Sequence, residues 1–174
     1  MGKSRKKTLS SNRPSFHEYF MLMAFAAATR SEDNYIKHGA IFVQKGSNHI
    51  IATGYNGTLK GLSQEQINAW NRDKRRPWMI HAEENAIQNC TKHPSSLPFG
   101  AVMYVTGKPC PSCLLRVVNF GIKEMYVAQR MGSMTDTHET HVMVNTIIKS
   151  REINYQLMHL ENEWVKKGLA LLGE

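Results

Sequence analysis

The alternation of strand and helix patterns in the second half of the chain restricts its fold more than any other part of the sequence does. Apolar strand-like runs and helix-like segments follow one another from residue 81 to residue 158. Strands that are joined through helices pair in parallel, and their right-handed crossovers place the helices on the faces of a sheet. The expected elements are helices at 81–92, 110–120 and 139–151 and strands at 101–107, 123–128 and 154–158.

The first half adds a helix and a hairpin. Ser15 and Glu18 fit a capping box at the start of a helix that runs from residue 16 to about residue 30. Two β-branched runs, 39–44 and 49–54, flank a Gly-Ser-Asn turn and predict an antiparallel hairpin. The buried face of the helix is expected to carry Phe20, Met23, Ala24 and Ala27.

Together these patterns predict one α/β domain at residues 14–174, a three-layer α/β/α sandwich with a mixed central sheet and a last helix at 161–172. Residues 1–13 carry five basic side chains and no acidic one, which is typical of a flexible arm. Residues 62–80 combine a short helical pattern with the basic stretch NRDKRR, and we interpret them as an insertion or lid.

Composition narrows the class of protein. The 174 residues include 22 lysines and arginines against 14 acidic residues, and the net charge of +8 favours anionic partners. No apolar run reaches the roughly 18 residues of a membrane span, and the basic N-terminus lacks the apolar core of a secretory signal. Three cysteines are typical of a reducing compartment, so we expect a soluble, cytoplasmic protein that does not bind membranes.

Two short motifs at the starts of neighbouring predicted helices carry potential metal ligands. His81 and Glu83 open one helix, and Cys110 and Cys113 open the next. One strand lies between these helices, so crossover geometry brings both helix starts to the same edge of the sheet. The two cysteines are three residues apart, about 300° around a helix, and can face one point. Two thiolates and one imidazole are a donor set that suits zinc.

The number of ligands separates a catalytic zinc site from a structural one. Cys90, the third cysteine, follows His81 by nine residues, about 180° around the helix, and is expected in the core. Three protein ligands leave a fourth position for water, which is typical of catalytic zinc. Glu83 stands where it can move protons at that position, whereas Glu84 is expected to be a surface residue.

The two motifs together, H-x-E and P-C-x-x-C, are the signature of zinc-dependent deaminases. With them, the segments EYFMLMAFAAATRS, GAIFV, ATGYNG, HAEENAI, MYVTGKPCPSC and NFGIKEMYV resemble the cytidine deaminase-like superfamily, and within it the deoxycytidylate (dCMP) deaminases. These segments cover most of residues 18–127. The resemblance implies the cytidine deaminase-like fold, zinc held by His81, Cys110 and Cys113, and proton transfer by Glu83.

The resemblance further implies that dCMP is hydrolysed to dUMP with release of ammonia. Asn56 is then the residue that contacts the sugar hydroxyl of the substrate. The carbonyl of Ala82 is a candidate acceptor for the exocyclic amine, and Arg130 is a candidate for holding the 5′-phosphate.

Regulation is a second implication of the resemblance. The family forms hexamers that dCTP activates and dTTP inhibits, each bound with magnesium, so we expect a homo-oligomer with nucleotide effectors. The candidate effector-site residues are Gly54, Tyr55, Gly57 and Lys92. Some phage relatives hold a second, structural zinc, but this chain has Glu32 and Met79 at two of the ligand positions. We therefore expect one zinc ion per subunit.

Two other functions stay open at this point. A cytosine or adenosine deaminase of tRNA or DNA would use the positive charge and the NRDKRR stretch, which Trp70 and Trp78 flank as candidate stacking rings. A zinc-stabilised binding module without activity would need a closed site with a fourth protein ligand.

Overall fold

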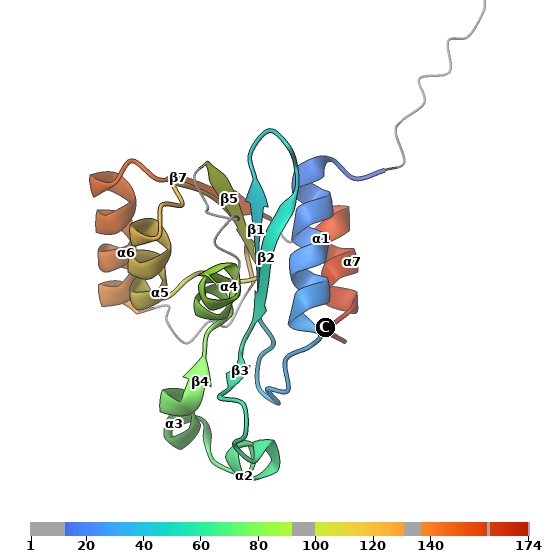
Figure 1. The fold of residues 1–174 in the computed structure, drawn as a ribbon, viewed down its shortest axis with the longest axis vertical. Helices are drawn as coiled ribbons and strands as arrows, with labels where there is room; N and C mark the ends of the chain where they lie inside the picture. The colour runs from blue at the N-terminus through green and yellow to red at the C-terminus, as the bar shows by residue number, and fades with distance from the viewer. Residues whose placement is uncertain (1–12, 92–99, 131–136, 160, 174) are drawn as a thin grey trace, which may run out of the picture.

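Figure 1 shows a computed structural model in which a five-stranded sheet lies between two layers of helices; it describes residues 13–91, 100–130, 137–159 and 161–173. The strand order is β2-β1-β5-β6-β7. The first strand pairs antiparallel with β2 and β5, whereas β5, β6 and β7 are parallel. The bounds are β1 Gly39–Gln44, β2 Ile50–Tyr55, β5 Ala101–Val105, β6 Glu124–Ala128 and β7 Asn154–Met158. The predicted three-layer sandwich with a mixed sheet is confirmed.

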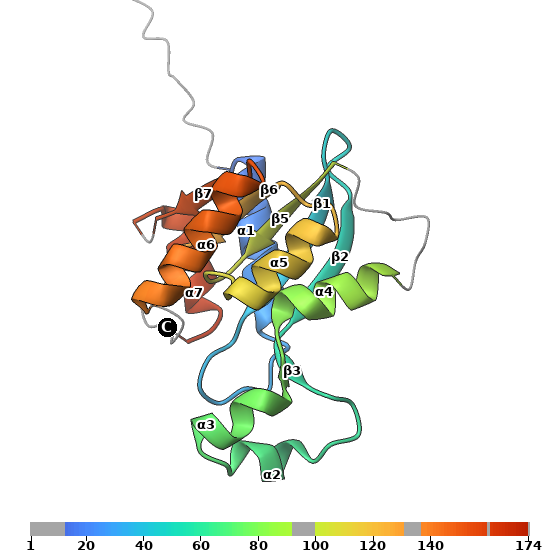
Figure 2. The ribbon, with the colours of Figure 1, turned by 90° about the vertical axis from the view of Figure 1, so that its left-hand side faces the viewer.

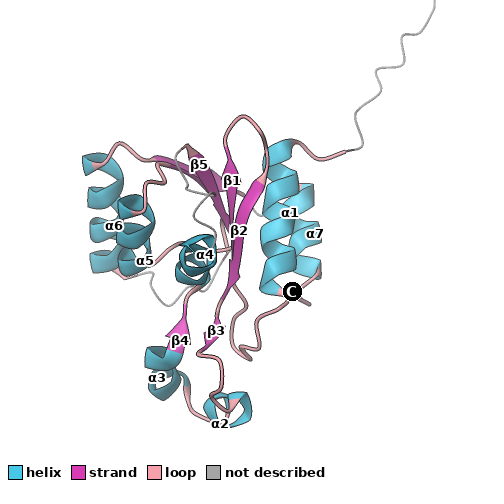
Figure 3. Ribbon diagram, viewed as in Figure 1, coloured by secondary structure: helices cyan, strands magenta, loops and turns pink. Residues whose placement is uncertain are grey.

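The helices are divided between the two faces of the sheet (Figures 1 and 3). One face is covered by α1 (Phe16–Ala28) and α7 (Glu163–Ala170), and the other by α4 (Ala82–Thr91), α5 (Pro111–Asn119) and α6 (His138–Ser150). Each face has its own apolar core, because alternate side chains of the central strands point to opposite sides.

The first helix begins at the predicted capping box, in which the Ser15 hydroxyl accepts from the Glu18 amide. Its buried face is wider than predicted. The structure buries Phe20 and Ala24 as expected, but it leaves Met23 and Ala27 partly exposed. The other buried positions are Met21, Phe25 and Ala28. The reason is that α7 packs beside α1. The two helices are so close that a Cβ atom at Gly168 would overlap the ring of Phe25.

Residues 57–80, hereafter the extension, project from the edge of the sandwich (Figure 2). Their elements are β3 Gly57–Thr58, α2 Gln64–Asn68, α3 Arg72–Arg75, the 3₁₀ turn η1 Arg76–Trp78 and β4 Met79–Ile80. The two short strands pair antiparallel and close the base of the extension, a pairing that the sequence patterns did not predict. Trp70 packs edge-on against Trp78 with ring centroids 5.8 Å apart.

Two further predictions concern the N-terminal arm and a membrane-spanning helix. The basic arm proposed for residues 1–13 lies, except for Arg13, outside the described residues. In the described part of the chain, no helix has the length and apolar character that crossing a membrane requires.

Candidate active site

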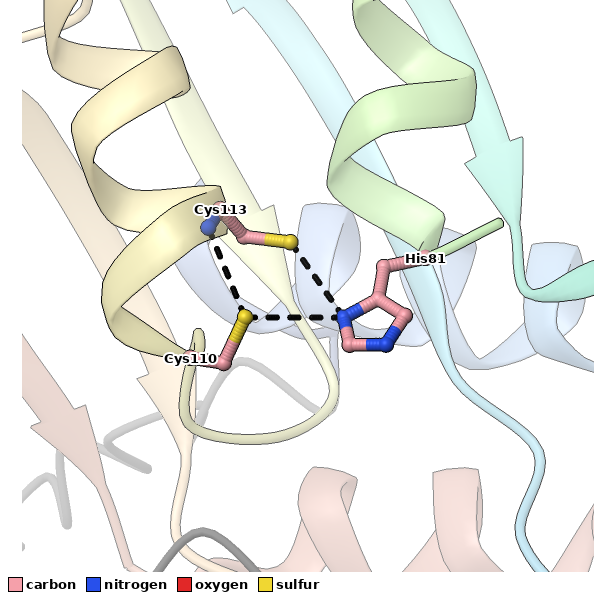
Figure 4. Close-up of side chains that lie close together, drawn as sticks. All are labelled: His81, Cys110 and Cys113. Atoms are coloured by element: carbon pink, nitrogen blue, oxygen red, sulfur yellow. Dashed lines mark hydrogen bonds between the residues drawn. The ribbon is translucent and has the colours of Figure 1, made fainter. Parts of the chain in front are cut away.

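The two predicted ligand motifs meet at the starts of α4 and α5 (Figure 4). His81 directly precedes α4, and Cys110 caps α5. The Cys110 backbone is extended, with φ −68° and ψ 160°, so Cys110 precedes the helix and does not lie in it as expected. Its sulfur accepts a hydrogen bond from the Cys113 amide at 3.4 Å, which turns both sulfurs toward His81.

The spacing of the three side chains fits a zinc ion. The Nδ1 atom of His81 lies 3.6 Å from the Cys110 sulfur and 3.3 Å from the Cys113 sulfur, and all three donor atoms lie within 4.8 Å of one another. Tetrahedral zinc with ordinary bond lengths separates a sulfur and a nitrogen ligand by about 3.6 Å. Cys113 is buried and Cys110 half-buried, while His81 is exposed, so the cluster can be reached from one side.

Protonation in the cluster also fits a cation. Hydrogen bonding from Cys113, and also from His81, lowers the pKa of Cys110 to about 4. The hydrogen bond to Cys110, together with burial, raises the pKa of Cys113. Without a cation, therefore, one sulfur ionises easily and the second does not. A zinc ion between them removes this obstacle, because metal binding displaces the proton of a ligating thiol.

Glu83 lies in the first turn of α4 and is only 5% exposed. Burial raises the pKa of its carboxyl group to about 7. A carboxyl group with a pKa near neutrality can both accept and donate a proton at ordinary pH, as a general acid–base catalyst must. Cys90, in contrast, is buried in the apolar core behind α4, as predicted.

A pocket of about 120 Å³ lies in front of the cluster. Its walls include His81, Ala82, Glu83 and Cys110, so four predicted site residues share one cavity. The predicted substrate residue Asn56 lines the same pocket from the end of β2. The extension contributes Arg75, Arg76 and Met79.

The amide of Asn56 is held in one orientation. Its Oδ1 accepts from the His38 amide at 2.7 Å, and its Nδ2 donates to the Ile36 carbonyl at 2.9 Å and to Asp33 Oδ2 at 3.2 Å. A backbone N–H only donates, and a backbone carbonyl only accepts, so the amide cannot flip without losing these bonds. Both Nδ2 protons are used, and toward a ligand Asn56 can act only as an acceptor.

Asp33 and Arg75 are site residues that the sequence analysis missed. Asp33 Oδ1 accepts from the amides of Tyr35 and Ile36 and from Arg75 Nη2, the last at 2.8 Å. The two charged side chains are 4% and 3% exposed, and the Arg75 guanidinium lies 4.3 Å from the centre of the Tyr35 ring. The bonds from the amides of Tyr35 and Ile36 to Asp33 form an Asx turn, in which an aspartate accepts from amides two and three residues later. A turn of this kind could have been predicted from the sequence.

The other predicted residues within the described part of the chain do not line this pocket. Arg130 is not among the residues that line it, and its Nη1 donates to the Lys37 carbonyl at 2.7 Å. Gly54 is buried where β2 passes α4, so closely that a Cβ atom would overlap the Ala82 carbonyl oxygen. Lys92 lies outside the described residues.

Tyr55 and Gly57 line a second cavity, of about 350 Å³, at the base of the extension. Two cations, Arg30 and Lys60, and one carboxylate, Glu32, also face this cavity. The predicted effector residues are therefore divided between a packing position, this cavity and the part of the chain that is not described.

Comparisons with known proteins agree with the geometry. Residues 14–129 match the family model described as the cytidine and deoxycytidylate deaminase zinc-binding region. The deoxycytidylate deaminase of Pongo abelii is 40% identical over 114 residues, which are 62% of this chain and 61% of that protein. ComE operon protein 2 of Bacillus subtilis is 30% identical over 86% of this chain and 78% of its own length.

A solved structure is similar over most of the chain. The dCMP deaminase of the cyanophage S-TIM5, in complex with dCMP and dUMP, superposes with a TM-score of 0.64 and 25% identity, over 84% of this chain and 98% of that one. The fold is thus the cytidine deaminase-like fold that the sequence resemblance implied. Since the family match covers more than half of the chain and includes all three metal ligands, this chain belongs to the cytidine and deoxycytidylate deaminase family of zinc-binding domains.

Proposed function

We propose that the protein catalyses hydrolytic deamination of dCMP to dUMP with release of ammonia. The observation that carries this proposal is the convergence of His81, Cys110 and Cys113 beside a buried Glu83 in one pocket. The deoxycytidylate deaminases among the relatives support the choice of substrate. Because the chain spans 61% of the length of the Pongo abelii enzyme, the substrate is part of the proposal.

Each residue has a role in this reaction. A zinc ion held by His81, Cys110 and Cys113 would acidify a water molecule, which would be the nucleophile for C4 of the pyrimidine. Glu83 would accept the proton that water loses and deliver it to ring nitrogen N3 as hydroxide adds to C4. It would then carry the proton of the new C4 hydroxyl to the amine, which leaves as ammonia when the C4–N bond breaks. Ala82 lines the pocket, but its carbonyl oxygen lies against Gly54 of β2, so its role as acceptor for the exocyclic amine stays a prediction. The acceptor lone pair of Asn56 is suited to the 3′-hydroxyl, the one sugar hydroxyl of a 2′-deoxynucleotide that is free to donate.

An ammonia-release assay tests this function directly. We expect turnover of dCMP to exceed by a wide margin the turnover of cytidine, dCTP and a cytosine-containing single-stranded oligonucleotide. A phosphodiester at the 3′ oxygen has no proton for Asn56, whose side chain can act toward a ligand only as an acceptor. Preferential deamination of the oligonucleotide would contradict the proposal.

That outcome would favour the alternative, a cytosine or adenosine deaminase of tRNA or DNA. The observation that favours this alternative is the basic extension. Its Arg75 and Arg76 line the pocket, and Lys74 precedes them in the chain. However, the rings expected to stack on bases pack on each other, and the Lys74 ammonium lies 4.6 Å from the centre of the Trp70 ring. This arrangement supports a role of both tryptophans in the fold of the extension.

We further propose allosteric control by dCTP and dTTP with magnesium, in a homo-oligomer that the family resemblance makes a hexamer. The cavity beside Tyr55 and Gly57 supports an effector site, since Arg30 and Lys60 suit phosphates and Glu32 suits a cation. The Tyr55 carbonyl accepts from Asn85 of α4 at 2.9 Å, which links this cavity to the helix that carries Glu83. The need for free thiols at the metal site supports action in the reducing cytoplasm.

Regulation predicts a nucleotide response. We expect dTTP to inhibit and dCTP to activate the turnover of dCMP, and Lys60→Gln to weaken both effects without lowering the unregulated rate. The measurement is initial velocity at sub-saturating dCMP against effector concentration. A flat response up to millimolar effector would show that this chain is not regulated in this way.

A further inference from the structure

The charges around the pocket leave a net positive rim. Two thiolates would balance one zinc ion, Asp33 is balanced by the Arg75 guanidinium at 2.8 Å, and Glu83 adds at most one negative charge. The other cationic side chains that line the pocket are Arg76 and Lys108. A ligand whose pyrimidine lay at the metal cluster would carry an anion at its other end within reach of these cations.

The backbone holds Arg76 at the rim from both sides. Before it, the side chain of Arg75 is anchored in a buried ion pair with Asp33 and lies over the ring of Tyr35. After it, Pro77 stiffens the 3₁₀ turn, and Met79 pairs with Thr58 in the short sheet. The side chain of Arg76 is exposed, and the ion pairs formed within the described part of the chain do not include it. Arg76 therefore combines a fixed backbone with a cationic side chain at the wall of the pocket.

We propose that Arg76 binds the 5′-phosphate of the nucleotide and thereby determines specificity for a mononucleotide over a nucleoside, with Asp33 and Arg75 as positioning residues. This inference rests on the proposed function for the identity of the ligand. A guanidinium suits this task, since it donates two parallel hydrogen bonds to phosphate oxygens. The ion pair of Asp33 ties the same extension to Asn56, so the sugar contact and the phosphate contact are held in one arrangement.

Binding of the product, measured by titration calorimetry on the zinc-loaded protein, tests the assignment without requiring turnover. We expect the unaltered protein to bind dUMP at least about tenfold more tightly than deoxyuridine. Arg76→Gln should weaken dUMP binding by roughly 10- to 100-fold, as for loss of hydrogen bonds to a charged group, and leave deoxyuridine binding within about twofold. Arg76→Lys should retain part of the preference for dUMP, because a lysine keeps the positive charge but cannot donate two parallel hydrogen bonds.

Two control variants make the result specific. Lys74→Gln removes a neighbouring charge of α3 that lies over Trp70 and not in the pocket, and it should leave both affinities unchanged. Arg130→Gln tests the arginine suggested by the sequence, which here donates to the Lys37 carbonyl. Each of three results would overturn the assignment. The first is that Arg76→Gln weakens the binding of dUMP and deoxyuridine equally. The second is that the unaltered protein shows no preference for dUMP, and the third is that Arg130→Gln, and not Arg76→Gln, loses that preference. Failure of the ammonia assay with dCMP, by contrast, would overturn the proposed reaction while leaving this binding test interpretable.

Discussion

Glu83→Gln is expected to lower the turnover of dCMP by roughly 10²- to 10⁴-fold while zinc stays bound. The amide has nearly the shape of the carboxyl group, so the fold and the three ligands are preserved, but it cannot accept and return a proton. The Glu83 carboxyl group is buried beside the metal ligands. Among the residues that line the pocket, the other acidic side chain is Asp33, which is held in an ion pair with Arg75. The measurement is kcat by ammonia release, together with metal content by atomic absorption.

Glu84→Gln is the matched control for this variant. Glu84 is the next residue of the same helix, but it is one-third exposed and pairs with Arg116 at 2.6 Å on the surface. We expect near-normal turnover and a stability change within about 1 kcal/mol. Both proteins should contain one zinc ion per chain. If Glu83→Gln were as active as the unaltered protein, Glu83 would have no role in the chemistry. If neither the variants nor the unaltered protein released ammonia, a zinc-stabilised binding module would be favoured.

Arg75→Gln is expected to destabilise the protein by about 3–5 kcal/mol, because it leaves the buried carboxylate of Asp33 without its charged partner. For a chain of this size, that loss corresponds to a fall in Tm of roughly 6–20 °C. Part of the effect should appear in KM for dCMP, since Asp33 also holds Asn56 and the extension. Thermal unfolding and steady-state kinetics measure the two consequences separately.

The control for this change is an ion pair of nearly the same length on the surface. Lys45 and Glu124 are 2.7 Å apart, but the lysine side chain is 67% exposed, so Lys45→Gln should cost no more than about 1 kcal/mol. It should also leave KM unchanged, because the pair does not line the candidate active site. If both variants lost the same small amount of stability, the Asp33–Arg75 pair would not be the link between the extension and the pocket.

The metal ligands could be predicted from the sequence because each is placed by its own short segment. His81 precedes one helix, and Cys110 and Cys113 open the next, so local geometry and one crossover bring them together. The positions of the strands in the sequence and the capping box at Ser15 were predictable for the same reason. The helical phase of Cys110 was the exception, since a capping residue has an extended backbone.

The features that the sequence did not reveal all depend on contacts between distant segments. The pair of Asp33 with Arg75 joins residues 42 positions apart, and a basic stretch such as NRDKRR gives no sign of which arginine is buried. The wide buried face of α1 depends on α7, and the orientation of the Asn56 amide depends on backbone groups of residues 36 and 38. Local pattern thus determined the strands, the helices and the metal ligands of this protein. Only the packed structure decided which charges are paired and which way a side chain faces, because burial and hydrogen-bond partners come from the whole fold.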